Sequence, residues 1–444
     1  MRGVATTIRW WGLACAVALF SPGPGWGAAG GSLLPGGEPG GGPPRAAGPR
    51  EEGKAAWTVM AYLRAHGGLK EAAAGYLGQF RAALEAGGAG AAGAGGAGSR
   101  VRVAAQVEDT REGRPARRVV LPAGSLSPTS AAAGEMGQAA TLADFIRWAQ
   151  QVAPAEHYAL LILAHGVPPA PEQPEPEELA GRLESGALAQ ALSEAAKPLE
   201  AAKPLEAGTP EARTPQFEVI FLDCCYSGSV EVADRVAGQA RYLVAAPGLL
   251  YAPGLPWGAI LSQLQRRPEM GGRELALAAS HEARKFWGER PETPASMVAV
   301  DLERLPAVTE ALRSLAQTAL PQVAELAPAL TLARGRTAAW GPQRELVEVA
   351  SFADALAETT SLPAVAAQAH RVSAAMHDAT VEAWRQDPAE NEETGVGMGI
   401  FLPLTIRAWS LRYGTDPGDG FEADWARLLR AYLQTMARLT AGGS

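Results

Sequence analysis

The sequence is short of cysteine, of net positive charge and of long apolar runs. Three cysteines in 444 residues are too few for a disulfide framework. Acidic residues outnumber basic ones by 47 to 39, which gives a net charge of -8 and predicts no nucleic-acid partner. No segment is long and apolar enough for an ordinary membrane span, so we expect no stable membrane insertion. The six histidines show no zinc-ligand spacing with the cysteines.

Residues 1–29 instead predict a signal peptide. Arg2 and Arg9 give a positively charged start, the apolar core WWGLACAVALF follows, and the small residues of GWGAAGG offer a cleavage site near residues 28–29. The apolar core is shorter than a membrane span, and an uncleaved anchor is the alternative. We therefore expect an exported protein, either secreted or held in the cell envelope.

Composition divides the remainder of the chain into three parts. Residues 30–55 are rich in proline and glycine and predict a disordered linker. Residues 56–260 alternate strands with helices, and residues 261–444 are rich in helices and complete the same domain. The strands are continuous apolar runs, as in LLILA and VIFL, which favours a mostly parallel sheet with helices on both faces.

Several individual elements can be placed from local patterns. Helical periodicity predicts a helix over residues 141–152, with Thr141 as its N-cap, and another over residues 362–384. Apolar runs predict strands at AAWTVMAYL, HYALLILAHG and FEVIFLDCC.

Two strands of this predicted sheet end at reactive side chains. His165 follows LLILA, and the pair Cys224 and Cys225 follows VIFLD. Ligands of open parallel sheets bind beyond the carboxyl ends of the strands, and a thiol needs a partner such as imidazole to become a nucleophile. A structural His-Gly turn and an inert buried cysteine are the alternatives for each residue alone. Their conjunction favours a Cys/His dyad.

These residues and the segments around them resemble the clostripain-like cysteine peptidases. WTVMAYL, the stretch from MGQAATLADF to ILAHG, FEVIFLDCCYSGSVEVA, RYLVAAPGLLYAPGLPW, ASMVAVDLERL and GVGMGIFLP occur in that family's order, from Trp57 to about Tyr432. The resemblance implies a caspase-like α/β/α sandwich, with residues 56–260 as its catalytic core. It also implies a peptidase that acts on proteins or peptides and cuts after basic residues.

The family motif assigns roles to particular residues. His165 matches the catalytic histidine, Cys225 the nucleophile and Cys224 a small-residue position. Side chains alternate along a strand, so only one of the two thiols can face a cleft. The backbone amides of Gly166 and Cys225 would form the oxyanion hole. Asp223 takes the place that lines the primary specificity pocket, where a carboxylate suits Arg or Lys; capping of the strand-end turn is its alternative role.

The sequence departs from the family at three points. His66-Gly67 replaces an Asp-Asn pair, and we expect His66 to be a loop residue. No acid occurs from Val244 to Trp257, where relatives carry acidic residues that help to build the cleft. GVPPAP replaces a triple glycine after His165. Calcium as a cofactor is suggested by the resemblance only. The sequence itself has no aspartate-rich calcium loop, and the acidic DPAENEE is typical of a solvated loop.

The leading hypothesis is an exported cysteine endopeptidase. A degenerate relative that binds peptides without cutting them, and a scaffold tethered by the Pro/Gly segment, are the alternatives from other classes. The long polar segment 167–216 predicts self-cleavage, because exposed loops of this kind are readily nicked. Arg213 is the first candidate and Arg182 the second, since Lys197 and Lys203 precede proline.

Overall fold

The structure is a computed structural model of the chain, and it describes residues 54–88, 100–108, 116–122, 127–128, 135–166, 183, 185–197, 216–341, 344–386, 396–405, 413 and 420–441. The predicted signal peptide, nearly all of the predicted linker, DPAENEE, Arg182 and Arg213 lie outside the described residues. Within the described ranges, no helix has both the length and the apolar character needed to cross a bilayer.

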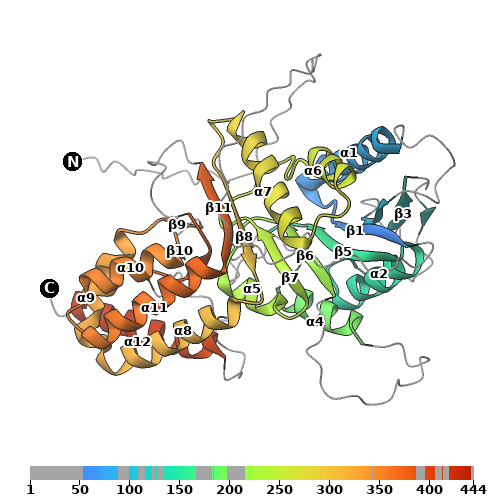
Figure 1. The fold of residues 1–444 in the computed structure, drawn as a ribbon. Helices are drawn as coiled ribbons and strands as arrows, with labels where there is room; N and C mark the ends of the chain where they lie inside the picture. Colours follow the sequence, from blue (N-terminus) through green and yellow to red (C-terminus); the bar gives the residue numbers. More distant parts are fainter. Residues whose placement is uncertain are drawn as a thin grey trace, which may run out of the picture.

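A nine-stranded sheet in the order β11-β8-β7-β6-β5-β1-β2-β3-β4 forms the centre of the fold (Figure 1). The five strands from β7 to β2 run parallel, and the outer strands on both sides pair antiparallel. The bounds are β1 (Ala55–Leu63), β2 (Val101–Val107), β3 (Arg117–Leu121), β4 (Ser127–Pro128), β5 (Ala155–Leu163), β6 (Phe217–Asp223), β7 (Ala240–Ala245), β8 (Ala295–Asp301) and β11 (Thr380–Gln386). The predicted mostly parallel sheet is confirmed.

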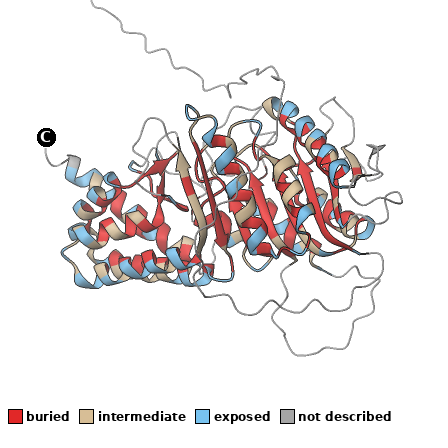
Figure 2. Ribbon diagram, turned by 45° about the horizontal axis from the view of Figure 1, so that its top comes forward, coloured by how far each residue is buried: buried red, intermediate tan, exposed pale blue. Residues whose placement is uncertain are grey.

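Helices cover both faces of the sheet because its central strands are apolar on both sides. One face carries α1 (Lys70–Gly88), which follows the short η1 (Gly67–Leu69), with α6 (Trp257–Arg266) and α7 (Gly272–Gly288). The other carries α2 (Ala139–Val152), α4 (Ser185–Ala195) and α5 (Val230–Val236). Alternate residues of β6 divide accordingly: Val219 and Phe221 face α1 and α6, while Ile220 and Leu222 face α2 and α4. Figure 2 shows the strands buried between the two layers.

A helical bundle lies beyond the β11 edge of the sheet (Figure 1). It consists of α8 (Leu305–Ala319), η2 (Leu320–Gln322), α9 (Val323–Gly335), α10 (Val349–Thr359), α11 (Pro363–Ala379) and α12 (Phe421–Ala441). A small antiparallel sheet joins it, in the order β12 (Gly399–Phe401), β10 (Leu346–Glu348) and β9 (Ala339–Trp340).

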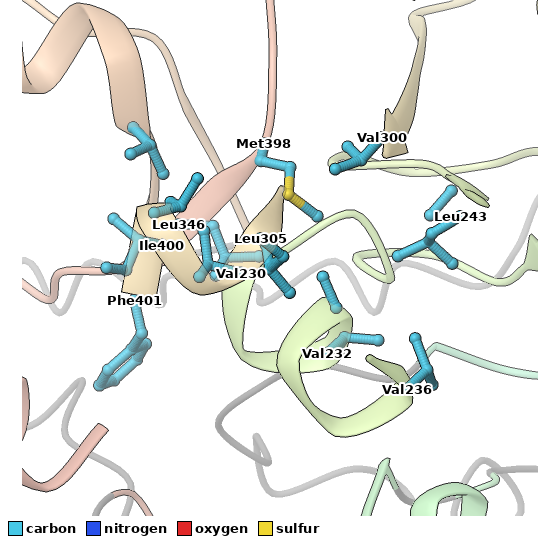
Figure 3. Packing of buried hydrophobic residues seen from close by; sticks show 14 of the residues in the cluster. Val230, Val232, Val236, Leu243, Val300, Leu305, Leu346, Met398, Ile400 and Phe401 are labelled. Carbon is cyan, nitrogen blue, oxygen red and sulfur yellow. The ribbon is translucent and has the colours of Figure 1, made fainter. Parts of the chain in front are cut away.

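The bundle and the central sheet share one apolar core. Val230, Val232 and Val236 of α5 lie in the same cluster as Leu243 and Val300 of the large sheet, and as Met398 and Ile400 at β12 (Figure 3). Strands β8 and β11 of the large sheet also come from residues after 260. We therefore propose that residues 261–444 belong to the same domain as residues 56–260.

Two predicted boundaries are wrong. Helix α2 begins at Ala139 with Gln138 at its N-cap position, so Thr141 lies inside the helix and does not cap it. The helix predicted over residues 362–384 ends at Ala379, and the chain continues as β11. The β-branched Thr380 and Val381 favour a strand, and pairing with β8 outweighs the helical periodicity there.

Candidate active site

The two predicted strand ends meet at the carboxyl edge of the sheet. Strands β5 and β6 are parallel neighbours, with Leu163 paired to Asp223, so His165 and Cys225 follow at the same edge. The loops after the two strands touch. A Cβ atom built on Gly166 would lie 2.9 Å from the carbonyl oxygen of Cys225 and 3.4 Å from its Cβ. The structure thus brings the backbone of Gly166 against Cys225.

The imidazole of His165 is positioned by the loop after β1. Its Nε2 lies 3.2 Å from the carbonyl oxygen of His66, and a Cβ on Gly67 would lie 3.5 Å from the same nitrogen. Gly67 has a φ of 54°, which suits glycine, and a Cβ there would make an ordinary van der Waals contact with the ring. When Nε2 carries the proton that it donates to His66, Nδ1 is the nitrogen able to accept another.

Cys225 is half-buried and contacts the segment after β7. Its Sγ lies 3.6 Å from the carbonyl oxygen of Leu250, and the Leu250 N–H donates to Sγ at 3.4 Å. Tyr226 has a φ of 58°, a conformation that side chains rarely adopt, and its N–H donates to Gly248 O at 2.9 Å. Strained backbone of this kind is concentrated at functional sites.

Cys224 points to the opposite face of the sheet. It is buried in the cluster that contains Ile220 and Leu222, and its thiol donates to Ile162 O at 3.6 Å. Burial raises the pKa of Cys224 well above its usual value, so the group stays a neutral thiol. The alternation predicted from strand geometry therefore separates the two cysteines.

Asp223, the last residue of β6, is only 3% exposed. Its Oδ2 accepts from the Tyr76 hydroxyl and from the Leu255 N–H, the latter at 3.1 Å. Burial raises the pKa of Asp223 to about 6, although both donors act to lower it. The carboxylate is thus satisfied by groups of the protein and lies in an apolar setting.

Glu231 connects the loop after Cys225 to the small sheet. Ser229 caps α5, and Glu231 in its first turn accepts from Phe401 N and from the Tyr413 hydroxyl, both at 2.9 Å. The Gly399 N–H donates to Gly228 O at 2.9 Å. Burial raises the pKa of Glu231, and its donors oppose that shift. These bonds hold the backbone that follows the nucleophile candidate.

Sequence reasoning did not find the residues that contact the Asp223 carboxylate and the Cys225 thiol. These residues, Tyr76, Leu250 and Leu255, are distant in sequence from β6, and tyrosine and leucine occur in any apolar core. The only signal was the absence of acid between Val244 and Trp257, which marked this segment as unusual without indicating its contacts. His66 does lie in a loop, as expected, and it contributes a backbone carbonyl to the site.

Comparisons with known proteins agree with this architecture. A family model described as the clostripain family matches residues 122–429, more than half of the chain. The fold resembles an inactive zymogen C11 protease from Parabacteroides distasonis, with a TM-score of 0.56 and 16% identity over 79% of this chain and 92% of that one. It also resembles a secreted C11 cysteine protease from Bacteroides thetaiotaomicron in complex with an irreversible peptide inhibitor, with a TM-score of 0.55 and 14% identity over 85% and 98%. A comparison with curated proteins gave no match.

Within the described residues, no cluster of three or more His, Cys, Asp or Glu side chains could hold a metal ion. The acidic segment DPAENEE lies outside the described residues.

Proposed function

The chain belongs to the clostripain family of cysteine peptidases, and we propose that it is an endopeptidase in which Cys225 is the nucleophile and His165 the general acid and base. The observation that carries this proposal is the contact between Gly166 and Cys225 at the adjoining ends of β5 and β6, beside an imidazole held by His66. A nucleophile and a base at neighbouring strand ends can act on the same peptide bond.

The proposed reaction begins when the thiol proton passes to Nδ1 of His165. The Cys225 sulfur then forms a bond to the peptide carbonyl carbon, and the carbonyl oxygen takes the electron pair as an oxyanion. The amides of Gly166 and Cys225 stabilise this charge. Collapse breaks the C–N bond while His165 protonates the leaving amine. Water, deprotonated by His165, hydrolyses the thioester and regenerates the thiol.

The Leu250 N–H has a part in this scheme that sequence reasoning did not foresee. It donates to Sγ, where it would stabilise the negative charge of a thiolate beside a protonated imidazole. Because the donor is a backbone amide, this contribution depends on the path of the segment after β7 and not on the side chain of residue 250.

For specificity, we assign the primary pocket to the neighbourhood of Asp223, and the preferred residues are Arg and Lys. The support is the position of this carboxylate at the end of β6, two residues before Cys225. The corresponding test is Asp223→Asn, which should lower kcat/KM on an Arg substrate by roughly ten- to a hundredfold, as expected for one charge-assisted contact. Unchanged kcat/KM on that substrate would give Asp223 the turn-capping role only.

Export and self-processing complete the proposal. Residues 1–29 serve as the signal peptide and residues 30–55 as the linker, and the mature enzyme is secreted or held in the cell envelope. The segment between the strands of His165 and Cys225 is cut by the enzyme itself. Export can be tested by N-terminal sequencing of the mature protein, which should begin near residue 29 or 30; retention of residues 1–29 would contradict it.

A labelling experiment separates the peptidase from a peptide-binding or scaffold protein of the same fold. Wild type, Cys225→Ala and Cys224→Ala are treated with iodoacetamide at neutral pH, and the alkylated residue is identified by mass spectrometry. An activated Cys225 should react quickly in wild type and in Cys224→Ala, and His165→Ala should slow it. Slow labelling of Cys225, insensitive to His165, would favour the non-catalytic alternatives.

A further inference from the structure

Tyr76 of α1 makes a contact that no feature of the sequence announces. Its hydroxyl donates to Oδ2 of Asp223 and accepts from the Leu255 N–H at 2.7 Å. The side chain is fully buried, and its ring packs against Phe80. Burial, with the Asp223 carboxylate, raises the pKa of Tyr76 well above its usual value, so the hydroxyl keeps the proton that it donates.

A turn at Gly254 lies against the same carboxylate and the same hydroxyl. Gly254, with a φ of 79°, donates its N–H to Tyr251 O at 2.8 Å and lies directly over Asp223. A Cβ on Gly254 would be 2.7 Å from both carboxylate oxygens of Asp223 and would collide with the Tyr76 hydroxyl. The covering turn therefore needs glycine, and it leaves no room between its backbone and the carboxylate.

The charged surroundings of Asp223 are sparse. Among the described residues its hydrogen-bond donors are Tyr76 from α1 and the Leu255 amide from the covering turn, and none of the described Lys or Arg side chains pairs with it. Cys224, the next residue along the chain, is a neutral buried thiol. A substrate cation would be the first full positive charge to reach this group, and it must compete with the two donors and displace the turn.

We propose that Tyr76 is a specificity-determining residue, which competes with a basic substrate side chain for the Asp223 carboxylate and so weakens the preference for Arg and Lys over uncharged residues. This inference rests on the proposed function, since it concerns the same pocket. A carboxylate that already accepts hydrogen bonds from the protein gains less binding free energy from a guanidinium than a carboxylate without such donors. Removal of the hydroxyl should therefore sharpen the preference.

Binding of agmatine, the decarboxylated form of arginine, which presents the same guanidinium group, tests the proposal without any need for catalysis. Calorimetry at pH 8 should show that Tyr76→Phe binds agmatine roughly tenfold more tightly than wild type, which is the worth of one such hydrogen bond. Tyr158→Phe is the matched control. The Tyr158 hydroxyl accepts from Ala155 N at the opposite end of β5, and the affinity of this variant for agmatine should equal that of wild type. Equal affinity of Tyr76→Phe and wild type, or a gain that survives in Tyr76→Phe/Asp223→Asn, would overturn the proposal.

A second measurement needs only the wild-type protein. Agmatine that takes the place of the covering turn must release the Leu255 N–H from Asp223 and Tyr76, so hydrogen exchange at Leu255 should accelerate when agmatine is added. Exchange that stays constant at saturating agmatine would contradict competition, even if Tyr76→Phe did not fold.

The kinetic consequence is a change in a ratio and in a pH profile. For Tyr76→Phe, kcat/KM on an Arg peptide divided by kcat/KM on the matching norleucine peptide should rise several-fold at pH 8. The Tyr76 bond lowers the pKa of Asp223, so its loss should move the acidic limb for the Arg peptide to higher pH and leave the norleucine profile in place. A merely structural Tyr76 would lower both rates together.

Failure of Cys225 to react or to cleave would refute the proposed function, while the agmatine result would still decide the role of Tyr76.

Discussion

Nε2 of His165 lies 3.2 Å from the backbone carbonyl oxygen of His66, across the parallel pair formed by β1 and β5. The acceptor belongs to the main chain, so the orientation of the imidazole depends on the path of the loop and not on the side chain of residue 66. The identity of residue 66 should therefore matter little, although its sequence position beside the site makes it conspicuous.

His66→Ala should retain kcat/KM within about threefold, because the carbonyl acceptor survives the substitution. Steady-state hydrolysis of a peptide substrate checks this, with His165→Ala as the inactive comparison. A loss of activity in His66→Ala as large as that in His165→Ala would give the His66 imidazole a role in the chemistry.

Cys225→Ala and His165→Ala should each abolish cleavage, since removal of either member of a cooperating nucleophile and base loses most of the activation. Cys224→Ala should stay active because its side chain lies on the other face of the sheet. Circular dichroism and peptide hydrolysis would be measured on all three. An active Cys225→Ala beside an inactive Cys224→Ala would exchange the roles of the two thiols.

Gly166→Ala should slow alkylation of Cys225 and peptide cleavage by roughly ten- to a hundredfold, the effect of a small misplacement of reacting groups. The added Cβ would meet Cys225 O at 2.9 Å, and that carbonyl must move. Gly186→Ala in α4 is the control, because its Cβ would have no heavy atom within 4 Å. Equal rates for the two variants would show that the loops after β5 and β6 accommodate the methyl group freely.

Asp223→Asn should stabilise the fold at pH 8 and not at pH 4. The folded-state pKa of about 6 is raised above the ordinary 3.8, so the folded protein holds the proton more tightly and loses stability as pH rises from about 4 to 6. The gain at pH 8 should be about 1–3 kcal/mol, since each pKa unit is worth about 1.4 kcal/mol. Urea unfolding at both pH values measures it.

The control is Asp144→Asn, at an exposed ion pair with Arg118, and it should change stability by less than about 1 kcal/mol. An equal effect of Asp223→Asn at pH 4 and pH 8 would contradict the shift.

Purified wild type should contain a cut after Arg213, with Arg182 as the second site, and Cys225→Ala should remain one chain. Both arginines lie outside the described residues, so this prediction rests on the small and turn-forming residues around Arg213 in GTPEARTPQ. Intact mass and N-terminal sequencing would decide it. The same cut in Cys225→Ala would assign the cleavage to another protease.

The central parallel strands of the sheet were predictable from the sequence because they are apolar on both faces, and their alternation with helices followed from that pattern. The end of α11 was not, because the segment from Thr380 to Trp384 continues a helical periodicity, and only its pairing with β8 makes it a strand. Short helices such as α5 were also missed, since seven residues carry too little periodicity to be recognised.

Within the candidate site, the residues that a motif or a strand end marks were predictable, namely His165, Gly166, Asp223 and Cys225. The contacts made by Tyr76 and by the turn at Gly254 were not. Tyr76 and Asp223 are separated by 147 residues, and only packing of α1 and the covering turn onto the end of β6 brings them together. A tyrosine in an amphipathic helix looks like any other core residue until its hydroxyl partner is known.

The bond from the Gly399 amide to Gly228 has a consequence for biosynthesis. Every side chain proposed to take part in chemistry or specificity precedes residue 260, but the loop after Cys225 is tied to β12, which the ribosome adds about 170 residues later. A nascent chain that ends before residue 396 carries Cys225 without the strand that fixes its loop. For the nucleophile proposed here, the order of synthesis thus delays completion of the loop after Cys225 until most of the chain has been made.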